Sequence, residues 1–329
     1  MVDLDYSKEL TEDEAALYDR QIRLWGLESQ KRLRAASVLL AGLNGYHAEV
    51  AKNIILAGVK SVTFLDHRSV TDLDACNQFF IPSTEVGKNR AEASVQRAES
   101  LNSMVNVIAD PANIDDKSEE YFKDFDVVCV SECTADQMKR VNTICRKYNK
   151  KFFAGDVFGT FGYTFADLVN HEFAEDVVQN KKIKVLDGVD AGKEKFEKIT
   201  VTIKSFEKFV PFEKILDVKK LPKDTEIYYL MLILLNFREK HQRDPLPSDR
   251  SLNALRDEAK KVIEKYSLGE KLDHLLNGDL YAQISPVCAI VGGVMGQEII
   301  KTVSQKERPH NNLFVFNPDT LCGQVLRLS

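Results

Sequence analysis

The segment from residue 37 to residue 66 constrains the fold most, because it combines a strand, a glycine-containing turn, a helix and a second strand. The strands are the apolar runs 37–41 and 62–65, and the helical pattern covers 48–57. Asp66 ends the second strand. This order is typical of a Rossmann-like unit, in which the loop and the N-terminus of the helix hold phosphate groups.

Strands and helices continue to alternate after this unit. A helical pattern covers 87–101, and strand-like apolar runs follow at 105–109, 126–130 and 151–155. Residues 159–163 then indicate a turn between extended segments. Repeated β-α-β order predicts a mostly parallel sheet with helices on both faces. The expected fold class is therefore α/β, with a Rossmann-like sheet.

The middle of the chain has a different character. Residues 179–198 are rich in Lys, Asp and Gly and indicate a loop or linker. The longest apolar run, 227–235, is nine residues long and predicts a buried helix rather than a membrane span. A charged helix is expected at 252–266. The predicted division is a first Rossmann-like part, a loop and helical insertion, and a completing C-terminal part, at 1–177, 178–280 and 281–329.

The last part contains a long helix and a pair of strands. The helix is expected over 285–303, with Pro286 in its first turn, where the missing N–H costs nothing. Its glycines, Gly292, Gly293 and Gly296, predict close packing against another element. The alternating runs 313–316 and 324–328 indicate the strand pair.

Composition and charge exclude some classes of function. Hydrophobic residues make up 44% of the chain and charged residues 29%, as in ordinary globular proteins. The net charge of −5 provides no basic surface for nucleic acid, and the acidic N-terminal segment does not have the order of a signal peptide. We therefore expect neither a nucleic-acid nor a membrane partner. Lys181, Lys182 and Lys184 form a small basic cluster that is compatible with nuclear import or with a solvated loop.

The six cysteines show no metal-site spacing. Only two of them are close in sequence, and no second pair completes a four-ligand zinc set. We expect buried, reduced thiols and no metal at positions 76, 129, 133, 145, 288 and 322.

The glycine loop departs from a working nucleotide loop. Gly42 fills the first glycine position and Gly45 follows, but Asn44 stands at the second position and adds bulk where a pyrophosphate must approach. His47 stands where the third glycine is expected, and its imidazole would crowd the helix–strand contact or the phosphate. The scaffold therefore predicts a Rossmann-like pocket that has lost its ligand. An acid at Asp66 also leaves an NAD-dependent oxidoreductase as an alternative.

Four separate motifs, together with the glycine loop, carry a resemblance to a known family. They are YDRQIRLWG (18–26), VGKNRAEAS (86–94), GDVFGTFGYTF (155–165) and SPVCAIVGGVMGQEIIK (285–301). Together they resemble the ThiF-like adenylation domains of ubiquitin-like-protein activating enzymes. The third motif is most similar to the small, non-cysteine subunit of the SUMO-activating branch.

The resemblance implies that this is the inactive copy of a paired adenylation domain. Asn77, in DACNQFF, stands where the family has a phosphate-contacting Arg, and Arg90 stands at its Lys position. Ala135 takes the place of a metal-binding Asp, with Asp136 displaced by one residue. Without these charges, an ATP triphosphate would not be neutralised during adenylation. The expectation is that this chain alone binds no cofactor or metal, and that ATP and Mg²⁺ bind in the partner's site.

An inactive copy can still contribute an arginine. In the family, the Arg of the Y-D-R-Q motif reaches the ATP phosphates of the other subunit, which assigns that role to Arg20, with Arg23 as possible support. The alternative is that both arginines pair with acids such as Asp19. Trp25 is interpreted as an anchor in the interface or the core.

The resemblance also implies partners and a reaction. The C-terminal glycine of SUMO is adenylated, transferred to a cysteine of the large catalytic subunit and then passed to the SUMO-conjugating enzyme. The expected location is the nucleus, with the cytoplasm as a second location. The remaining alternatives are a homodimeric adenylating enzyme of the sulfur-carrier type and a scaffold that never contacts ATP.

Overall fold

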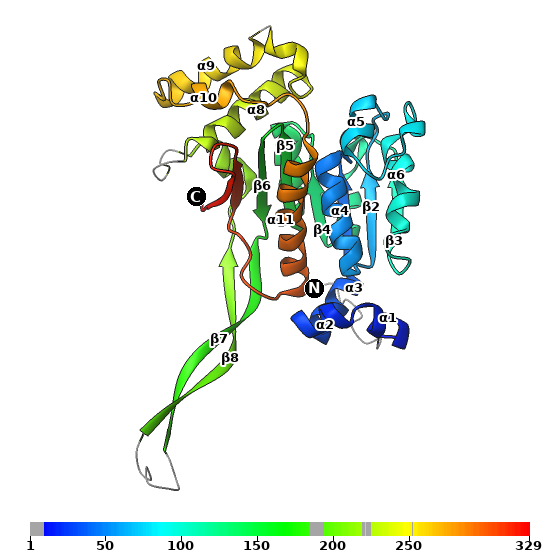
Figure 1. Cartoon of the computed structure of the whole chain (residues 1–329), viewed down its shortest axis with the longest axis vertical. Coiled ribbons are helices and arrows are strands. Elements are labelled where there is room, and N and C mark those ends of the chain that lie inside the picture. Colours follow the sequence, from blue (N-terminus) through cyan, green and yellow to red (C-terminus); the bar gives the residue numbers. More distant parts are fainter. Residues whose placement is uncertain (1–9, 185–193, 219–220, 222–224, 252) are drawn as a thin grey trace.

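The computed structural model describes residues 10–184, 194–218, 221, 225–251 and 253–329 (Figure 1). An eight-stranded sheet forms its centre, with the order β10-β9-β6-β5-β4-β1-β2-β3. Its strands are β1 (Ser37–Ala41), β2 (Ser61–Leu65), β3 (Asn106–Asp110), β4 (Val127–Val130), β5 (Lys151–Phe158), β6 (Phe161–Asp167), β9 (Leu313–Asn317) and β10 (Cys322–Leu326). The strands expected from the apolar runs are all present.

The sheet has a parallel part and an antiparallel part. Strands β5, β4, β1, β2 and β3 are parallel neighbours, with Leu39 of β1 opposite Thr63 of β2 and Val128 of β4. Strands β6, β9 and β10 extend the sheet antiparallel from β5. This mixed, mostly parallel sheet confirms the predicted α/β class. The turn expected over 159–163 is confirmed at residues 159 and 160, which connect β5 and β6, and it is wrong for residues 161–163, which begin β6.

Helices cover both faces of the sheet, because successive strand residues point to opposite sides. Val38 and Leu40 pack in a core with α3 (Leu27–Ala35), α4 (Gly45–Ala57), α6 (Arg90–Glu99) and α11 (Ser285–Ser304). Leu39 and Ala41 pack in a second core with α7 (Ala135–Lys147), α8 (Ile227–His241), α9 (Ala254–Tyr266) and α10 (Asp273–Leu276). The short helical elements are α1 (Glu12–Leu17), α2 (Asp19–Trp25), α5 (Asp72–Asn77), η1 (Ser83–Glu85), η2 (Ile114–Asp116), η3 (Glu119–Asp124), η4 (Phe212–Leu216) and η5 (Pro247–Arg250).

Helix α11 lies along α4, as Figure 1 shows. Two glycines of α11 allow the two helices to pack closely. A Cβ on Gly292 would lie 2.7 Å from the Glu49 Cβ, and one on Gly296 would lie 2.8 Å from the Asn53 Cβ. These two positions confirm the predicted close packing. The prediction is wrong for Gly293, where a Cβ would meet no atom of the described chain within 4 Å. Although α11 is long and apolar enough to cross a membrane, 61% of its apolar window is buried inside the fold, as in a core helix.

The interpretation of residues 179–198 as a loop is wrong for the described part of that segment. Residues 179–184 belong to β7 (Asn170–Lys184) and residues 194–198 to β8 (Glu194–Lys208), which pair antiparallel in a two-stranded ribbon that projects from the body (Figure 1). Strand β7 runs through residue 177, so the domain division at that position stays a prediction. Lys181 lies exposed in β7, and the side chains of Lys182 and Lys184 lie outside the described part.

The cysteines only partly match the expectation of buried thiols. Cys129, Cys133, Cys145 and Cys288 are buried free thiols, and burial raises the pKa of each. The prediction is wrong for the two others, Cys76 and Cys322, which are exposed.

Candidate functional site

A cavity of about 470 Å³ lies at the carboxyl ends of the parallel strands, where doubly wound folds bind nucleotides. It is bordered by Asn44 after β1, Arg68 after β2, Glu132 after β4 and Phe158 at the end of β5. The sequence-predicted positions Asn77 and Arg90 also line it. The fold therefore keeps the pocket that a nucleotide would use.

The glycine loop next to this cavity is held tightly against the neighbouring strand. Gly42 has φ of +83°, and a Cβ there would lie 2.2 Å from the carbonyl oxygen of Ser131, so only glycine fits without a shift. The Asn44 side chain caps α4 by accepting from the backbone N–H of His47 at 2.9 Å, and its Nδ2 donates to the Ser131 Oγ at 2.8 Å. The Asn44 side chain therefore satisfies one of the free N–H groups at the N-terminus of α4.

Two further backbone N–H groups of the loop are also occupied by protein oxygens. The N–H of Leu43 donates to the Asp66 Oδ2 at 2.7 Å, and the N–H of Gly45 donates to the Gln283 Oε1 at 3.0 Å. Gln283 belongs to the segment that leads into α11 and comes from the far end of the chain. These N–H groups are the ones that hold phosphate in a working loop. Here side-chain oxygens of the protein accept their hydrogen bonds in place of a phosphate.

His47 is fully buried on α4 and does not line the cavity, so it does not block a phosphate directly. Its ring stacks on Tyr46 with centroids 5.2 Å apart, and neither ring nitrogen has a hydrogen-bond partner within the described ranges. Burial lowers the pKa of the imidazole to about 4. The residue is therefore a neutral packing group near neutral pH.

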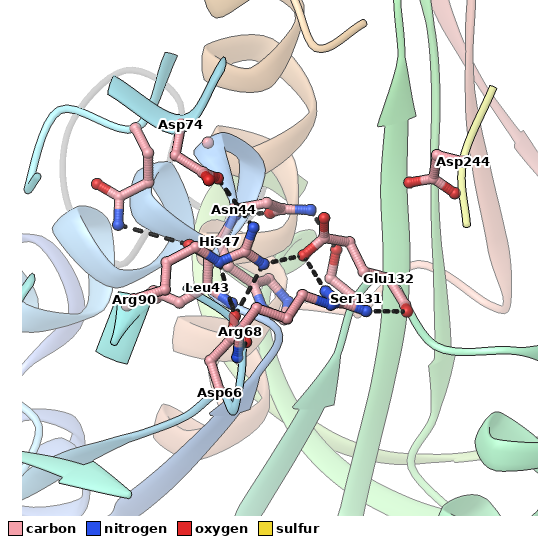
Figure 2. A network of polar contacts seen from close by, with 12 residues as sticks. Leu43, Asn44, His47, Asp66, Arg68, Asp74, Arg90, Ser131, Glu132 and Asp244 are labelled. Atoms are coloured by element: carbon pink, nitrogen blue, oxygen red, sulfur yellow. Dashed lines mark hydrogen bonds and ion pairs between the residues drawn. The ribbon is translucent and has the colours of Figure 1, made fainter. Parts of the chain in front are cut away.

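A network of carboxylates and guanidinium groups forms one wall of the cavity (Figure 2). Arg90 is buried and binds Asp66 at 2.8 Å, Asp74 at 2.9 Å and Glu132. Arg68 binds the same Glu132 oxygen at 2.6 Å. Although burial opposes the charged form, Arg68 and Arg90 lower the pKa of Glu132 to about 2. Glu132 is therefore ionised at neutral pH and holds both arginines.

A second network adjoins the first, because the backbone N–H of Glu132 donates to the Asp156 Oδ1 at 2.8 Å. Arg238 of α8 binds Asp156 at 2.7 Å and Asp244 at 2.6 Å, and both Arg238 and Asp156 are buried. Asp244 and Glu132 both line the cavity, and Figure 2 shows Asp244 on a separate segment from Glu132. Every arginine that lines the described cavity is thus paired with carboxylates, which leaves no free cation for a triphosphate. The residues present do not fit ATP.

The other predicted departures agree with this conclusion. Asn77 is half-buried, and its Nδ2 lies 3.5 Å from the carbonyl oxygen of Gln283. Ala135 begins α7, and Asp136 pairs with Lys139 at 2.8 Å on the surface, away from the cavity. Asp66, the possible ribose ligand, already accepts hydrogen bonds from Leu43, Arg68 and Arg90. The pocket therefore offers no ribose-binding carboxylate.

Arg20 and Arg23 lie on the exposed helix α2 and differ in their pairing. Arg23 binds the Asp19 carboxylate with two nitrogens, at 3.1 and 3.0 Å. Arg20 is exposed and has no hydrogen bond or ion pair with any residue that the structure describes. Within the described part of this chain, Arg23 therefore pairs with a neighbouring acid and Arg20 does not.

Helix α2 is anchored at both ends although it buries no residue of its own. Before it, Tyr18 is buried, and its hydroxyl accepts from the Asn102 Nδ2 at 2.9 Å. A Cβ on Gly58 would lie 2.5 Å from the Tyr18 ring. At its last residue, the Trp25 Nε1 donates to the Gln30 Oε1 at 3.0 Å, and Trp25 packs against the core of the α4 face. These contacts hold in place the helix that carries Arg20.

Arg20 and the cavity lie at opposite ends of α4. The glycine loop begins this helix, and Gly58, which contacts Tyr18, ends it. The helix has 13 residues, which corresponds to about 20 Å. That length is greater than an arginine side chain can span, so Arg20 cannot serve the cavity of its own chain.

Several residues of this site could not be found from sequence motifs. Arg68 and Glu132 flank the recognised motifs, but nothing in their local sequence predicts that they pair. Gln283 and the pair formed by Arg238 and Asp244 come from segments without a motif. A network of this kind is defined by the fold, because its members come from helices, strands and connections that are far apart in the sequence.

The comparisons agree with the fold. The model of the ThiF family matches residues 18–329, and the chain belongs to that family. It is 46% identical to SUMO-activating enzyme subunit 1 of Xenopus tropicalis, with 96% of each chain covered, and 45% identical to that of Homo sapiens, with 94% and 93% covered. At this similarity it belongs to the SUMO-activating enzyme subunit 1 branch. A crystal structure of selenomethionine PaaA matches with a TM-score of 0.57 and 14% identity over 98% of this chain and 76% of the other, which supports the fold alone.

Proposed function

We propose that this chain is the non-cysteine subunit of a heterodimeric SUMO-activating enzyme and that it completes the ATP site of its partner with Arg20. The observation that carries the proposal is the contrast between the two ends of α4. At one end, the charged side chains and loop N–H groups of the chain's own pocket are paired with one another, and at the other Arg20 is exposed and unpaired among the described residues.

An exposed apolar surface supports the need for a partner. Leu24 of α2 is 76% exposed, and Leu56 of α4 and Ile290 of α11 are each 45% exposed. Exposed apolar side chains of this size are typical of a protein–protein interface, and one of them lies on α2, the helix that carries Arg20. A pseudo-two-fold axis across α4 and α11 would place α2 of this chain beside the glycine loop of a related partner, because such an axis pairs opposite ends of equivalent helices.

In this arrangement Arg20 acts as a fixed positive charge beside the ATP that the partner binds with Mg²⁺. A guanidinium group can bind two phosphate oxygens at once and stays charged at every physiological pH. The adenylate forms on the SUMO C-terminal glycine, and the large subunit supplies the cysteine that accepts SUMO before the conjugating enzyme receives it. Arg23, which is already paired with Asp19, provides support. The nucleus is the proposed place of action.

Co-expression with the large subunit tests the assembly. We expect a one-to-one complex with a melting temperature clearly above that of the free chain, because the partner covers the apolar surface and binding stabilises the folded state. A free chain that stays monomeric and is as stable as the complex would contradict the requirement for a partner.

A further inference from the structure

A second cavity, of about 590 Å³, lies at the amino ends of the parallel strands, whereas the nucleotide pocket lies at their carboxyl ends. The amino ends of β4 and β5 form its floor, β7 and β8 form one wall where the ribbon leaves the body, and the last turn of α11 forms another. Its volume is in the range of small-molecule sites. It shares no lining residue with the nucleotide pocket.

Two buried polar side chains at this cavity are unsatisfied. His171 of β7 is 2% exposed and Thr302 of α11 is 4% exposed, and both line the cavity. The His171 Nε2 and the Thr302 Oγ1 have no hydrogen-bond partner in the described part of the chain. Because buried polar groups are nearly always paired, these two atoms indicate a ligand or water with polar groups of its own.

The charged groups at the cavity favour an anion. Lys150 has no acidic partner among the described residues, and Lys151 donates one hydrogen bond to the Leu168 carbonyl oxygen at 2.8 Å, which leaves it further donors. Arg32 donates to the Ser304 carbonyl oxygen at 2.6 Å. The three cations therefore lie together without a carboxylate bound to them.

The two acids at the cavity are already engaged elsewhere. Asp126 accepts from the backbone N–H of Ser37 at 2.9 Å, and Glu172 pairs with Lys204 at 2.9 Å. Burial, and then the nearby Lys151, lowers the pKa of His171 to about 4, so the imidazole is neutral and able to donate one hydrogen bond. The charged groups that are bound to no carboxylate of the described chain are therefore cations, which favours an anionic ligand.

The remaining lining is apolar. Val127 and Val303 contribute aliphatic surface, and the rings of Tyr148 and Phe206 also line the cavity, with Phe206 65% exposed. We propose that this cavity binds a small organic anion, in which a phosphate or carboxylate group contacts Lys150, Lys151 and Arg32 while an apolar body lies against these side chains.

Phenyl phosphate is a suitable probe, with inorganic phosphate and benzylamine for comparison. In calorimetric titrations of the full-length chain, we expect phenyl phosphate to bind, inorganic phosphate to bind more weakly, and benzylamine not to bind. Lys150→Glu should weaken phenyl phosphate binding by roughly 10- to 100-fold, the effect of losing one charge-assisted contact. Lys60→Glu is the matched control, because Lys60 is an exposed lysine just before β2 and lies outside the cavity.

The NMR signals of the His171 imidazole should shift during the same titration, since a ligand in this cavity lies beside that ring. Failure of phenyl phosphate to bind would overturn the proposal. Equal weakening by Lys150→Glu and Lys60→Glu would also overturn it, because the effect would then be one of overall charge. Tighter binding of benzylamine, or equal binding of inorganic phosphate, would contradict the predicted ligand class.

Discussion

Arg90→Met should destabilise the chain strongly, because Arg90 is buried and binds three carboxylates. Removing one partner of a buried ion pair typically costs about 3–5 kcal/mol, since the other charges stay buried without compensation. Arg68 still binds Glu132 in the variant, so the expected loss lies in that range although three contacts are lost. The free energy of unfolding is measured by urea denaturation at pH 7.

Arg97→Met is the matched control, because Arg97 lies on the same helix, is exposed and donates only to the Phe79 carbonyl oxygen. It should cost less than about 1 kcal/mol. Equal losses for the two variants would refute the conclusion that Arg90 balances the charge of the pocket.

The pH dependence provides a second test of the same network. The pKa of Glu132 is about 2 in the folded chain, against an ordinary value of 4.5. Its contribution to stability is therefore complete above pH 4.5 and is lost as the pH falls toward 2. Since Arg90 provides part of this contribution, the difference between wild type and Arg90→Met should be largest at pH 7 and smaller at pH 4. A difference that grows on acidification would contradict the assignment.

Two further predictions concern the anchoring of α2 and the pairing of the charged groups in the pocket. Gly58→Ala should lower the unfolding free energy by about 1 kcal/mol or more beyond the loss caused by Gly87→Ala. Both glycines have positive φ, but only a Cβ at Gly58 would collide with Tyr18. Equal losses in urea denaturation would contradict this contact. The purified chain alone should show no ATP–pyrophosphate exchange with any modifier, because the arginines of its pocket are paired with carboxylates. Exchange above background would contradict the conclusion that the residues of this pocket do not fit ATP.

The sequence predicted the Rossmann-like half well because its strands are buried on both faces and form continuous apolar runs. The ribbon of β7 and β8 was missed for the opposite reason. Its outer part, near residues 179–184 and 194–198, is rich in polar and charged residues, and Gln179, Asn180 and Lys198 are exposed. A strand without a buried face has no reason to show a clear alternation, so backbone pairing decided a structure that the side chains did not indicate.

The site was predictable where it depends on motifs. The changes at Asn44, Asn77, Arg90 and Ala135 were enough to predict a pocket that does not fit ATP. Which groups occupy the N–H donors of the loop was not predictable, because the N–H of Gly45 donates to Gln283, which is 238 residues away in the sequence. Contacts of this kind depend on the topology that brings α11 beside α4.

The most direct test of the central claim is the rate of adenylate formation by the heterodimer at limiting ATP, compared between wild type and Arg20→Ala. We expect a normal amount of heterodimer and a fall of roughly 10- to 100-fold in adenylation efficiency, which corresponds to a lost charge-assisted contact of about 1.5–3 kcal/mol. Arg20→Lys should recover part of the activity, because an ammonium group cannot bind two phosphate oxygens in the same fork, and Arg23→Ala should have a smaller effect than Arg20→Ala. Equal rates for wild type and Arg20→Ala at equal heterodimer concentration would contradict the account and reduce this chain to a scaffold.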